Sequence, residues 1–333
     1  MGTGLAVGLV LLIVERPEDG AKPAWADITA MARRGEELGA DTVWVPDEIV
    51  WRVPEWPGPR GWWDCLTMAG ALAASTSTVK VGTWVMSALQ HNPGMVVRAA
   101  ESLDEISGGR FVLGLGSGHG GGAEAFGYPG DKTVSRYLEA LEIIVPLLRG
   151  ESGVTFDGQF HHAKNAEVRP RGPRPGRIPL MLGGHADRTM TAAARHADTW
   201  SGYARSSSGS LPEAFAEMTS QLDRICEGIG RDPATIGRSV GVFVEPGNAK
   251  LAEGTGFGVA ITGSVEQITE TIARFSDVGV TRVEVVPWPP TLDVVEQLAP
   301  VFGAFAAAPQ KTGAKGGAEP PDGSPLRPGG EFS

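Results

Sequence analysis

The chain has 333 residues, of which 41% are hydrophobic and 20% are charged, so it can bury a large core and form one large α/β domain or two ordinary ones. Its formal net charge of −10 argues against broad, non-specific binding of nucleic acid, although a local basic site stays open. The two cysteines, Cys65 and Cys226, are far apart and form no disulfide framework, which favours a reducing cytoplasm.

The apolar segment 5–14 is predicted to be a buried first strand. A secretory signal would carry a basic region before it, whereas the acidic Glu15, Glu18 and Asp19 follow it directly. A myristoylation signal is excluded because Ala6 stands where serine or threonine is needed. No apolar run reaches the length of a membrane span, so no membrane partner is expected.

Short apolar runs then alternate with amphipathic helical segments along the chain. Most runs are continuously apolar, as is typical of parallel strands covered on both faces. The eight predicted strands are residues 5–12, 42–45, 79–85, 111–115, 178–182, 199–201, 239–244 and 282–286. This alternation favours an α/β fold of the (β/α)8 TIM-barrel type, with a doubly wound open sheet as the alternative.

Helix ends are marked in the sequence. Asn92 followed by Pro93 predicts a capped helix start, and Ser264 with Gln267 has the spacing of a capping box. The glycines at 108–109 are expected to end the helix that begins after Asn92.

Two segments stand outside this pattern. Residues 150–177 contain a predicted hairpin at 154–160 and then a stretch rich in Pro, Arg and Gly, which together form an insertion before the fifth strand. The tail from about residue 306 is rich in Gly, Pro, Ala and Lys and is predicted to be disordered. The expected organisation is therefore one barrel domain over residues 1–305 and a disordered tail over 306–333.

The segment 108–122 is the most informative part of the chain. Its apolar strand runs into a loop that is mostly glycine, with Ser117 and His119 as its polar side chains. Glycine lets the backbone take positive φ angles and approach a flat or phosphorylated ligand closely. In a barrel, this loop would share one rim with the segments 46–63, 86–92 and 183–185, so a sizeable cofactor is expected there.

The chain resembles the bacterial luciferase-like family of oxidoreductases. The matching pieces, in order, are VGTWV at Val81, the run SGGRFVLGLGSG, AEAFGYP at Ala123, RYLEALEIIVPLLRG at Arg136, IPLMLGGHADRTMTAAARHADTWSG at Ile178 and GVTRVEVVP at Gly279. Their order and spacing together are specific, and they cover nearly everything except the tail. The resemblance implies a (β/α)8 barrel that uses reduced FMN or the deazaflavin F420.

The resemblance also implies where the cofactor lies. The tricyclic ring would cross the barrel mouth, on a bulge at the end of the third strand that often contains a non-proline cis peptide and maps to Val85, Met86 and Ser87. Gly116, Ser117 and Gly118 would contact the ring and its ribityl chain, and Asp47 is expected at the cofactor as well. Independently, Gly183, Gly184 and His185 precede a predicted helix start, where free backbone N–H groups suit a phosphate. The alternative for this last turn is a plain loop with an exposed histidine.

Two side chains are candidates for proton transfer. Relatives that oxidise alcohols or sugars with F420 often carry Asp-His after the second strand and Glu beyond the glycine loop, whereas this chain has Asp47-Glu48 and His119 there. Hydride transfer to or from a substrate needs a matched proton donor or acceptor, so we expect Glu48 and His119 to be catalytic. The alternatives are that Glu48 only caps the loop or pairs with Arg52, and that His119 is simply solvated.

The segment around Trp44–Trp63 is rich in aromatic residues and proline, and its tryptophans are Trp44, Trp51, Trp56, Trp62 and Trp63. One interpretation is a lid over an apolar substrate pocket, with Trp51, Trp62 and the rim carboxylate Glu15 facing the substrate. The other is aromatic packing against neighbouring helices or a second subunit. The family resemblance implies a homodimer.

Metal binding is not expected, because none of the six histidines has a metal-ligand spacing. The basic cluster of Arg169, Arg171, Arg174 and Arg177 would suit the acidic oligoglutamate tail of F420, or it is an exposed arginine loop.

Three functions are carried forward. The first is F420-dependent hydride transfer to or from a small organic substrate, which the AEAFGYP segment favours because it most resembles F420-using members. The second is an FMN-dependent monooxygenase of the same fold that uses O2. The third is a non-catalytic cofactor-binding or partner subunit.

Overall fold

The computed structural model describes residues 4–306, apart from residue 55 and the segments 119–121, 204–210 and 248–259. Eight parallel strands close into a barrel in which each pairs with the next along the chain, β10 also pairs with β7, and β14 returns to β1. They are β1 (Ala6–Val10), β2 (Thr42–Val45), β5 (Lys80–Thr83), β7 (Phe111–Gly116), β10 (Leu180–Gly183), β11 (Thr199–Tyr203), β12 (Gly237–Pro246) and β14 (Arg282–Pro287). The predicted (β/α)8 barrel is confirmed, and the open-sheet alternative is wrong.

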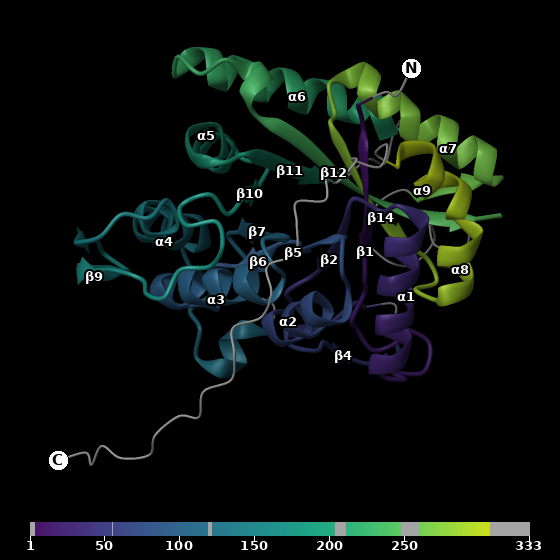
Figure 1. Ribbon diagram of the computed structural model, residues 1–333, viewed down its shortest axis with the longest axis horizontal. Coiled ribbons are helices and arrows are strands. Elements are labelled where there is room, and N and C mark those ends of the chain that lie inside the picture. The colour runs from purple at the N-terminus through teal and green to yellow at the C-terminus, as the bar shows by residue number, and fades with distance from the viewer. Residues whose placement is uncertain (1–3, 55, 119–121, 204–210, 248–259, 307–333) are drawn as a thin grey trace, which may run out of the picture.

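Helices surround the barrel, with α1 and α8 on the right, α6 at the top, α4 on the left and α2 at the bottom of Figure 1. The helices are α1 (Trp25–Leu38), α2 (Cys65–Ser75), α3 (Pro93–Ile106), α4 (Thr133–Leu148), α5 (Asp187–His196), α6 (Leu211–Gly228), α7 (Val265–Ala273), α8 (Leu292–Gln297) and α9 (Ala299–Phe305). Asn92 caps α3 through Gly94 N–H and Met95 N–H, and Ser264 and Gln267 form a capping box at α7. Both predicted helix starts are thus confirmed.

Two apolar cores lie on the two faces of the strands. On β1, Leu9 packs in the core between barrel and helices, whereas its neighbour Val10 packs in the core inside the barrel. Leu182 and Met181 divide in the same way on β10. Successive strand residues point to opposite faces, so a strand that is buried on both faces reads as continuously apolar.

The interior of the barrel is filled below its mouth. Trp44 is fully buried there and donates through its indole Nε1–H to Glu284 Oε2, while Ser239 and Arg282 donate to Glu284 Oε1. Burial raises the pKa of Glu284, against the opposing effect of Arg282. A Cβ atom at Gly8 would overlap the Glu284 carboxylate, so the interior has no room for one more methyl group there.

Short strands that the sequence did not predict decorate this barrel. A hairpin of β3 (Val50–Trp51) and β4 (Arg60–Gly61) lies between β2 and α2, and β6 (Met86–Ser87) and β13 (Ile261–Gly263) extend the barrel sheet beside β7 and β12. The insertion contains the antiparallel pair β8 (Val154–Asp157) and β9 (His162–Ala166), which confirms a hairpin there but extends it beyond the predicted residue 160. The predicted tail falls outside the described residues, apart from residue 306. None of the helices in the described part combines the length and apolar character that a membrane crossing requires.

Candidate functional site

Half-buried aromatic side chains line the carboxyl-end mouth of the barrel. They pack on the inner core and come from the loop after β2, the ends of β5 and β12, and the turn after β14: Trp51, Trp62, Trp84, Phe243 and Trp288. The rings of Phe243 and Trp288 meet edge to face at 6.3 Å. The mouth therefore offers an apolar, partly accessible floor, which is the lining that organic ligands require.

The tryptophan segment is anchored to the chain that follows β1. Glu15 Oε2 accepts a hydrogen bond of 2.8 Å from Gly61 N–H, and the Arg60 guanidinium donates to the carbonyl oxygens of Arg16 and Pro17. The hairpin places the rings of Trp51 and Trp62 edge to face, 4.4 Å apart. Two predicted pocket residues thus lie together, whereas Glu15 is engaged in holding the hairpin backbone.

Trp44 does not belong to this segment in space. Its indole fills the barrel interior and is fully buried, so it cannot form part of a lid. Trp63 is 43% exposed and donates to Pro23 O, away from the Trp51–Trp62 pair.

The predicted bulge lies where β5 ends. A non-proline cis peptide joins Trp84 to Val85, one bond before the predicted stretch, and Met86 and Ser87 then pair with Leu115 and Gly116 of β7. Met86 and Ser87 are both buried.

Asp47 connects the end of β2 to this bulge. One carboxylate oxygen, Oδ2, accepts a 2.9 Å hydrogen bond from Ser87 N–H and lies 3.0 Å from His91 Nε2. The Asp47 side chain is only 7% exposed, and that of His91 is 20% exposed. An ionised carboxylate can only accept, so Nε2 is the donor in this pair and Nδ1 is the other ring nitrogen that can exchange a proton.

Sequence reasoning missed His91 as a site residue. The segment 86–92 was expected on the rim, but His91 itself was weighed only as a metal ligand. Its pairing with Asp47 joins residues 44 positions apart and arises because β2 and β5 are neighbours in the barrel. In the described segments, no cluster of three or more His, Cys, Asp or Glu side chains is arranged to hold a metal ion.

The glycines of the predicted cofactor turns pack around the bulge. A Cβ atom at Gly116 would lie 2.8 Å from Val85 Cγ2, and one at Gly183 would lie 3.3 Å from it. Gly118 has φ +68°, and a Cβ there would overlap Ser87 Oγ. Gly116 and Gly118 therefore leave room for the side chains of Val85 and Ser87, whatever ligand they also contact, whereas a side chain at Gly183 would make only a tight contact with Val85. Between them, Ser117 Oγ donates to Gly118 O at 3.2 Å.

The turn after β10 leads into α5 as predicted. Gly184 N–H donates to Ser201 O at 3.3 Å, and Ala186 caps α5 without a side-chain hydrogen bond to the first turn. The first N–H groups of α5 are thus left without a side-chain acceptor, as an anion site at a helix start requires. The His185 side chain or backbone also takes part in an interaction.

Of the two predicted catalytic residues, only Glu48 lies in the described part of the chain. Glu48 is half-buried beside Asp47 and takes part in an interaction, but its proposed role stays a prediction. His119 lies outside the described residues.

The arginine cluster lies at the opposite end of the barrel. Arg174 pairs with the buried Asp104 and donates to Phe111 O at the start of β7, while Arg171 pairs with the buried Glu101. Strand starts form the amino-terminal rim, so these two arginines do not approach the mouth. The interpretation of the cluster as a site for the F420 tail is not supported.

A closed (β/α)8 barrel with aromatic side chains and glycine-rich strand ends at its carboxyl end defines a class of barrel proteins with their functional site at that mouth. Residues 5–249 match the family described as luciferase-like monooxygenase. The chain belongs to this family, which confirms the resemblance and the prediction of an oxidoreductase of this type.

Individual relatives of the chain include enzymes that are oxidoreductases by name. An F420-dependent glucose-6-phosphate dehydrogenase of Beutenbergia cavernae is 30% identical over 239 residues, which are 69% of this chain and 67% of that enzyme. A 5,10-methylenetetrahydromethanopterin reductase of Archaeoglobus fulgidus is 32% identical over 163 residues, 49% of this chain and 45% of that enzyme. The second match thus spans less than half of that relative's length.

Solved structures share the fold at low identity. An F420-dependent secondary alcohol dehydrogenase in complex with an F420–acetone adduct superposes with a TM-score of 0.75 at 16% identity, over 90% of this chain and 99% of that one. A riboflavin lyase with modified FMN and riboflavin gives 0.73 at 15% identity, over 91% and 92%.

Proposed function

We propose that this chain is an oxidoreductase that uses coenzyme F420 to transfer a hydride to or from a small organic substrate. The observation that carries the proposal is the bulge at Met86–Ser87, which Asp47 holds beneath an aromatic barrel mouth. The F420-dependent relatives give the choice of cofactor its support. When bound, the deazaflavin supplies the carbon that donates or accepts the hydride.

The residues at the mouth fit such a group. Ser87 Oγ and Trp84 Nε1 are buried polar atoms for which no hydrogen-bond partner exists in the described part of the chain. Buried polar atoms are normally paired, so these two are open to a polar ring system. Ser117 and Gly118 would hold the ring edge, and the uncapped start of α5 beyond Gly184 would hold the phosphate.

Proton transfer needs a group that can accept and release a proton beside the hydride acceptor or donor. We assign this role to His91 in addition to Glu48. Asp47 orients the imidazole through Nε2, and Nδ1 makes no hydrogen bond within the described segments, so it can accept a proton. Asp47 also stabilises the imidazolium that forms, as a carboxylate does for a general base. His119 stays a candidate from its place in the sequence.

The substrate pocket is proposed to lie over the aromatic floor. Trp51 and Trp62 form an apolar wall that excludes water, while the Glu15 carboxylate supports that wall by binding Gly61 N–H. An apolar wall of this kind favours a substrate with an apolar body next to its reacting carbon.

An FMN-dependent monooxygenase is the second candidate function. Its support is the likeness of the fold to the riboflavin lyase and to a Streptomyces bottropensis monooxygenase, which has a TM-score of 0.68 and 18% identity. The two cofactors differ in their reaction with oxygen, since reduced F420 reacts poorly with it.

We further propose a cytoplasmic homodimer with residues 1–305 as its catalytic domain. Light scattering of the full chain would measure its mass, and a monomer at micromolar concentration would contradict this proposal.

The cofactor is tested by titrating the purified full-length protein with F420 and with FMN, following absorbance and fluorescence, and then measuring oxygen consumption with each reduced cofactor. We expect saturable F420 binding and turnover that is independent of oxygen. Tight FMN binding with oxygen-dependent product would establish the second candidate instead. Binding of neither cofactor would favour the non-catalytic subunit.

A further inference from the structure

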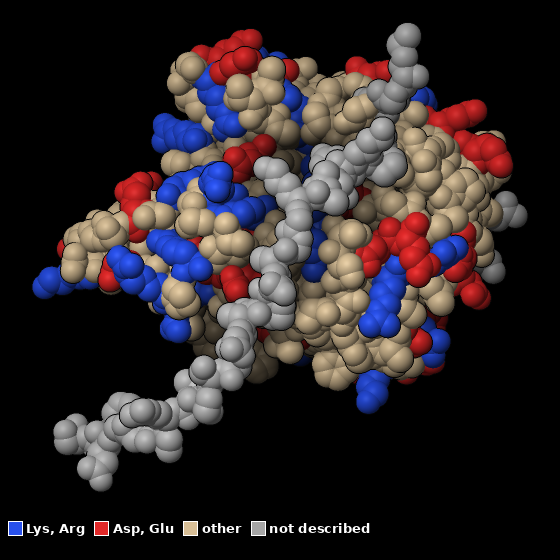
Figure 2. Space-filling view, viewed as in Figure 1, with Lys and Arg blue, Asp and Glu red and all other residues tan. Residues whose placement is uncertain are grey.

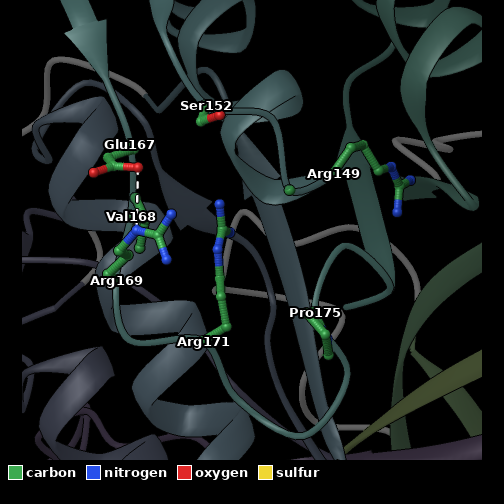
Figure 3. A pocket seen from close by; sticks show the side chains of 8 residues that line it. Arg149, Ser152, Glu167, Val168, Arg169, Arg171 and Pro175 are labelled. Carbon is green, nitrogen blue, oxygen red and sulfur yellow. Dashed lines mark hydrogen bonds and ion pairs between the residues drawn. The ribbon is translucent and has the colours of Figure 1, made fainter.

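A cavity of about 360 Å³ opens at the amino-terminal end of the barrel, on the other side of the filled interior from the mouth. The end of α4, the insertion and the approach to β10 form its walls (Figure 3). Its lining residues are Arg149, Gly150, Ser152, Glu167, Val168, Arg169, Arg171 and Pro175. The volume is within the range of small-molecule sites, but most of the lining is polar or charged rather than apolar.

Three arginines and one glutamate line the cavity, and each arginine is paired with one carboxylate, which belongs to Asp198, Glu167 or Glu101. The whole chain carries −10, so a cavity lined by three guanidinium groups departs from the average composition of the chain. Figure 2 shows acidic and basic side chains interspersed over the face in view, with Lys and Arg gathered on the left, over α4 and the β8–β9 hairpin. A local positive site raises the concentration of anions near it.

Arg171 is held rigidly at the base of the cavity. Its Nη1 donates at 2.7 Å both to Glu101 Oε1 and to Leu147 O, and the Glu101 side chain is only 3% exposed. The other Glu101 oxygen accepts from Gly172 N–H. Glu101 thus holds one nitrogen of the guanidinium and the backbone after it, and within the described residues the Nε and Nη2 groups of Arg171 have no acceptor.

Arg169 points into the same space as Arg171 in Figure 3. It is tied by Nε to Glu167 Oε2 at 3.1 Å, and its two terminal nitrogens make no hydrogen bond to the described part of the protein. Arg149 lines the other wall, where it pairs with Asp198 at 3.1 Å, and the Ser152 hydroxyl lies above. Two guanidinium groups with unused N–H donors therefore converge on one opening.

We infer that this cavity binds a phosphate group, as inorganic phosphate or as part of a small phosphorylated metabolite. The planar guanidinium presents paired N–H donors that match phosphate oxygens, and its charge strengthens each bond. The site is independent of the proposed cofactor site, because the fully buried Trp44 and Glu284 fill the barrel between them.

The test uses the full chain without added cofactor, in an amine buffer at constant ionic strength. Inorganic phosphate and glycerol 3-phosphate are each titrated by calorimetry into the wild-type protein and the Arg169→Gln variant. Arg169 suits this purpose because its side chain is 78% exposed, so its loss leaves the core intact. The matched control is Arg16→Gln, which removes another exposed arginine, paired with Asp19.

We expect saturable phosphate binding that Arg169→Gln weakens about 10- to 100-fold, the effect of one or two charge-assisted hydrogen bonds, and that Arg16→Gln leaves unchanged. Tighter binding of glycerol 3-phosphate than of inorganic phosphate would identify a metabolite as the ligand, and equal binding would identify the free ion. Equal binding by all three proteins would overturn the inference. So would displacement of the phosphate by F420, since the site would then be at the mouth. F420 binding is measured separately, so failure here leaves the proposed function standing.

Discussion

Replacing His91 with glutamine separates orientation of the bulge from proton transfer. The amide of the introduced glutamine can still donate to Asp47 Oδ2, so the hydrogen bond to Ser87 N–H and the position of the bulge should persist. An amide cannot accept and release a proton near neutral pH, so a proton-transfer role would be lost. We therefore expect F420 affinity to stay within about threefold while turnover falls about 10²- to 10⁴-fold, the range for a general acid or base.

Replacing Asp47 with alanine, in contrast, should weaken the binding of F420. The carboxylate accepts from two donors in a site where its own side chain is 7% exposed, so its loss leaves Ser87 N–H and His91 Nε2 unpaired. Each hydrogen bond to a charged group contributes about 1.5–3 kcal/mol. If half of one such bond is expressed in cofactor binding, the dissociation constant rises about 3- to 12-fold, at about 1.4 kcal/mol per factor of ten.

Fluorescence titration gives the F420 dissociation constant, and steady-state kinetics over a range of pH give turnover for each variant. The matched control is His162→Gln, which changes another histidine that pairs with an aspartate, Asp157, at 2.8 Å, in the exposed β8–β9 hairpin far from the mouth. Turnover of the His91→Gln variant equal to that of this control would refute the assignment of His91. Unchanged cofactor affinity in Asp47→Ala would refute the role of the bulge.

Two further predictions concern stability. Burial alone would raise the pKa of Asp41, but Arg282 and Lys80 lower it from 3.8 to about 2. The ionised carboxylate therefore contributes about 2 kcal/mol to the free energy of unfolding above pH 4, and this contribution is lost as the pH falls toward 2. Asp41→Asn should therefore unfold in less urea than the wild type at pH 7, with a gap that narrows below pH 4, and a gap independent of pH would contradict this linkage. Gly118→Ala should lose about 1–3 kcal/mol of stability and weaken F420 binding, because φ is +68° and the new methyl group would overlap Ser87 Oγ. The control Gly228→Ala, where the added methyl group meets no atom within 4 Å at the end of α6, should be neutral or slightly stabilising, and equal losses in both glycine variants would exclude the steric argument.

The barrel was predictable because its strands are buried on both faces. All eight predicted strands overlap the observed ones, since a continuous apolar run such as that of β2 leaves little choice of structure. The two-residue strands β3, β4 and β6 were missed because such pairings depend on tertiary contacts rather than on periodicity. Membership of the family was also visible in the order of the motifs.

The site was predictable only in part. The segments that hold Ser87 and Gly118 were expected on one rim, because strand ends of a barrel lie together, and the structure brings these two residues into contact. Their role as cofactor contacts stays a prediction. The pairing of His91 with Asp47 depends on side-chain directions across two strands, which no local pattern contains. Trp44 was grouped with the lid although it lies in a strand, where alternate side chains turn inward.

The arginine insertion illustrates a different limit. In a (β/α)8 barrel, a segment that precedes a strand lies at the amino-terminal end, and this position alone would have kept the insertion away from the cofactor. The affinity of guanidinium groups for acidic groups nevertheless made the F420 tail one of the two interpretations. The buried partners Glu101 and Asp104 decided between these interpretations, and they lie about 70 positions earlier in the chain.

The filled barrel interior around Trp44 and Glu284 prevents small molecules from passing along the barrel axis. A molecule on the aromatic floor cannot pass on through the barrel to its amino-terminal end, so substrate and product of the proposed reaction would both enter and leave on the carboxyl-end side. An inhibitor large enough to cover the carboxyl-end mouth would prevent release of any molecule bound on the aromatic floor.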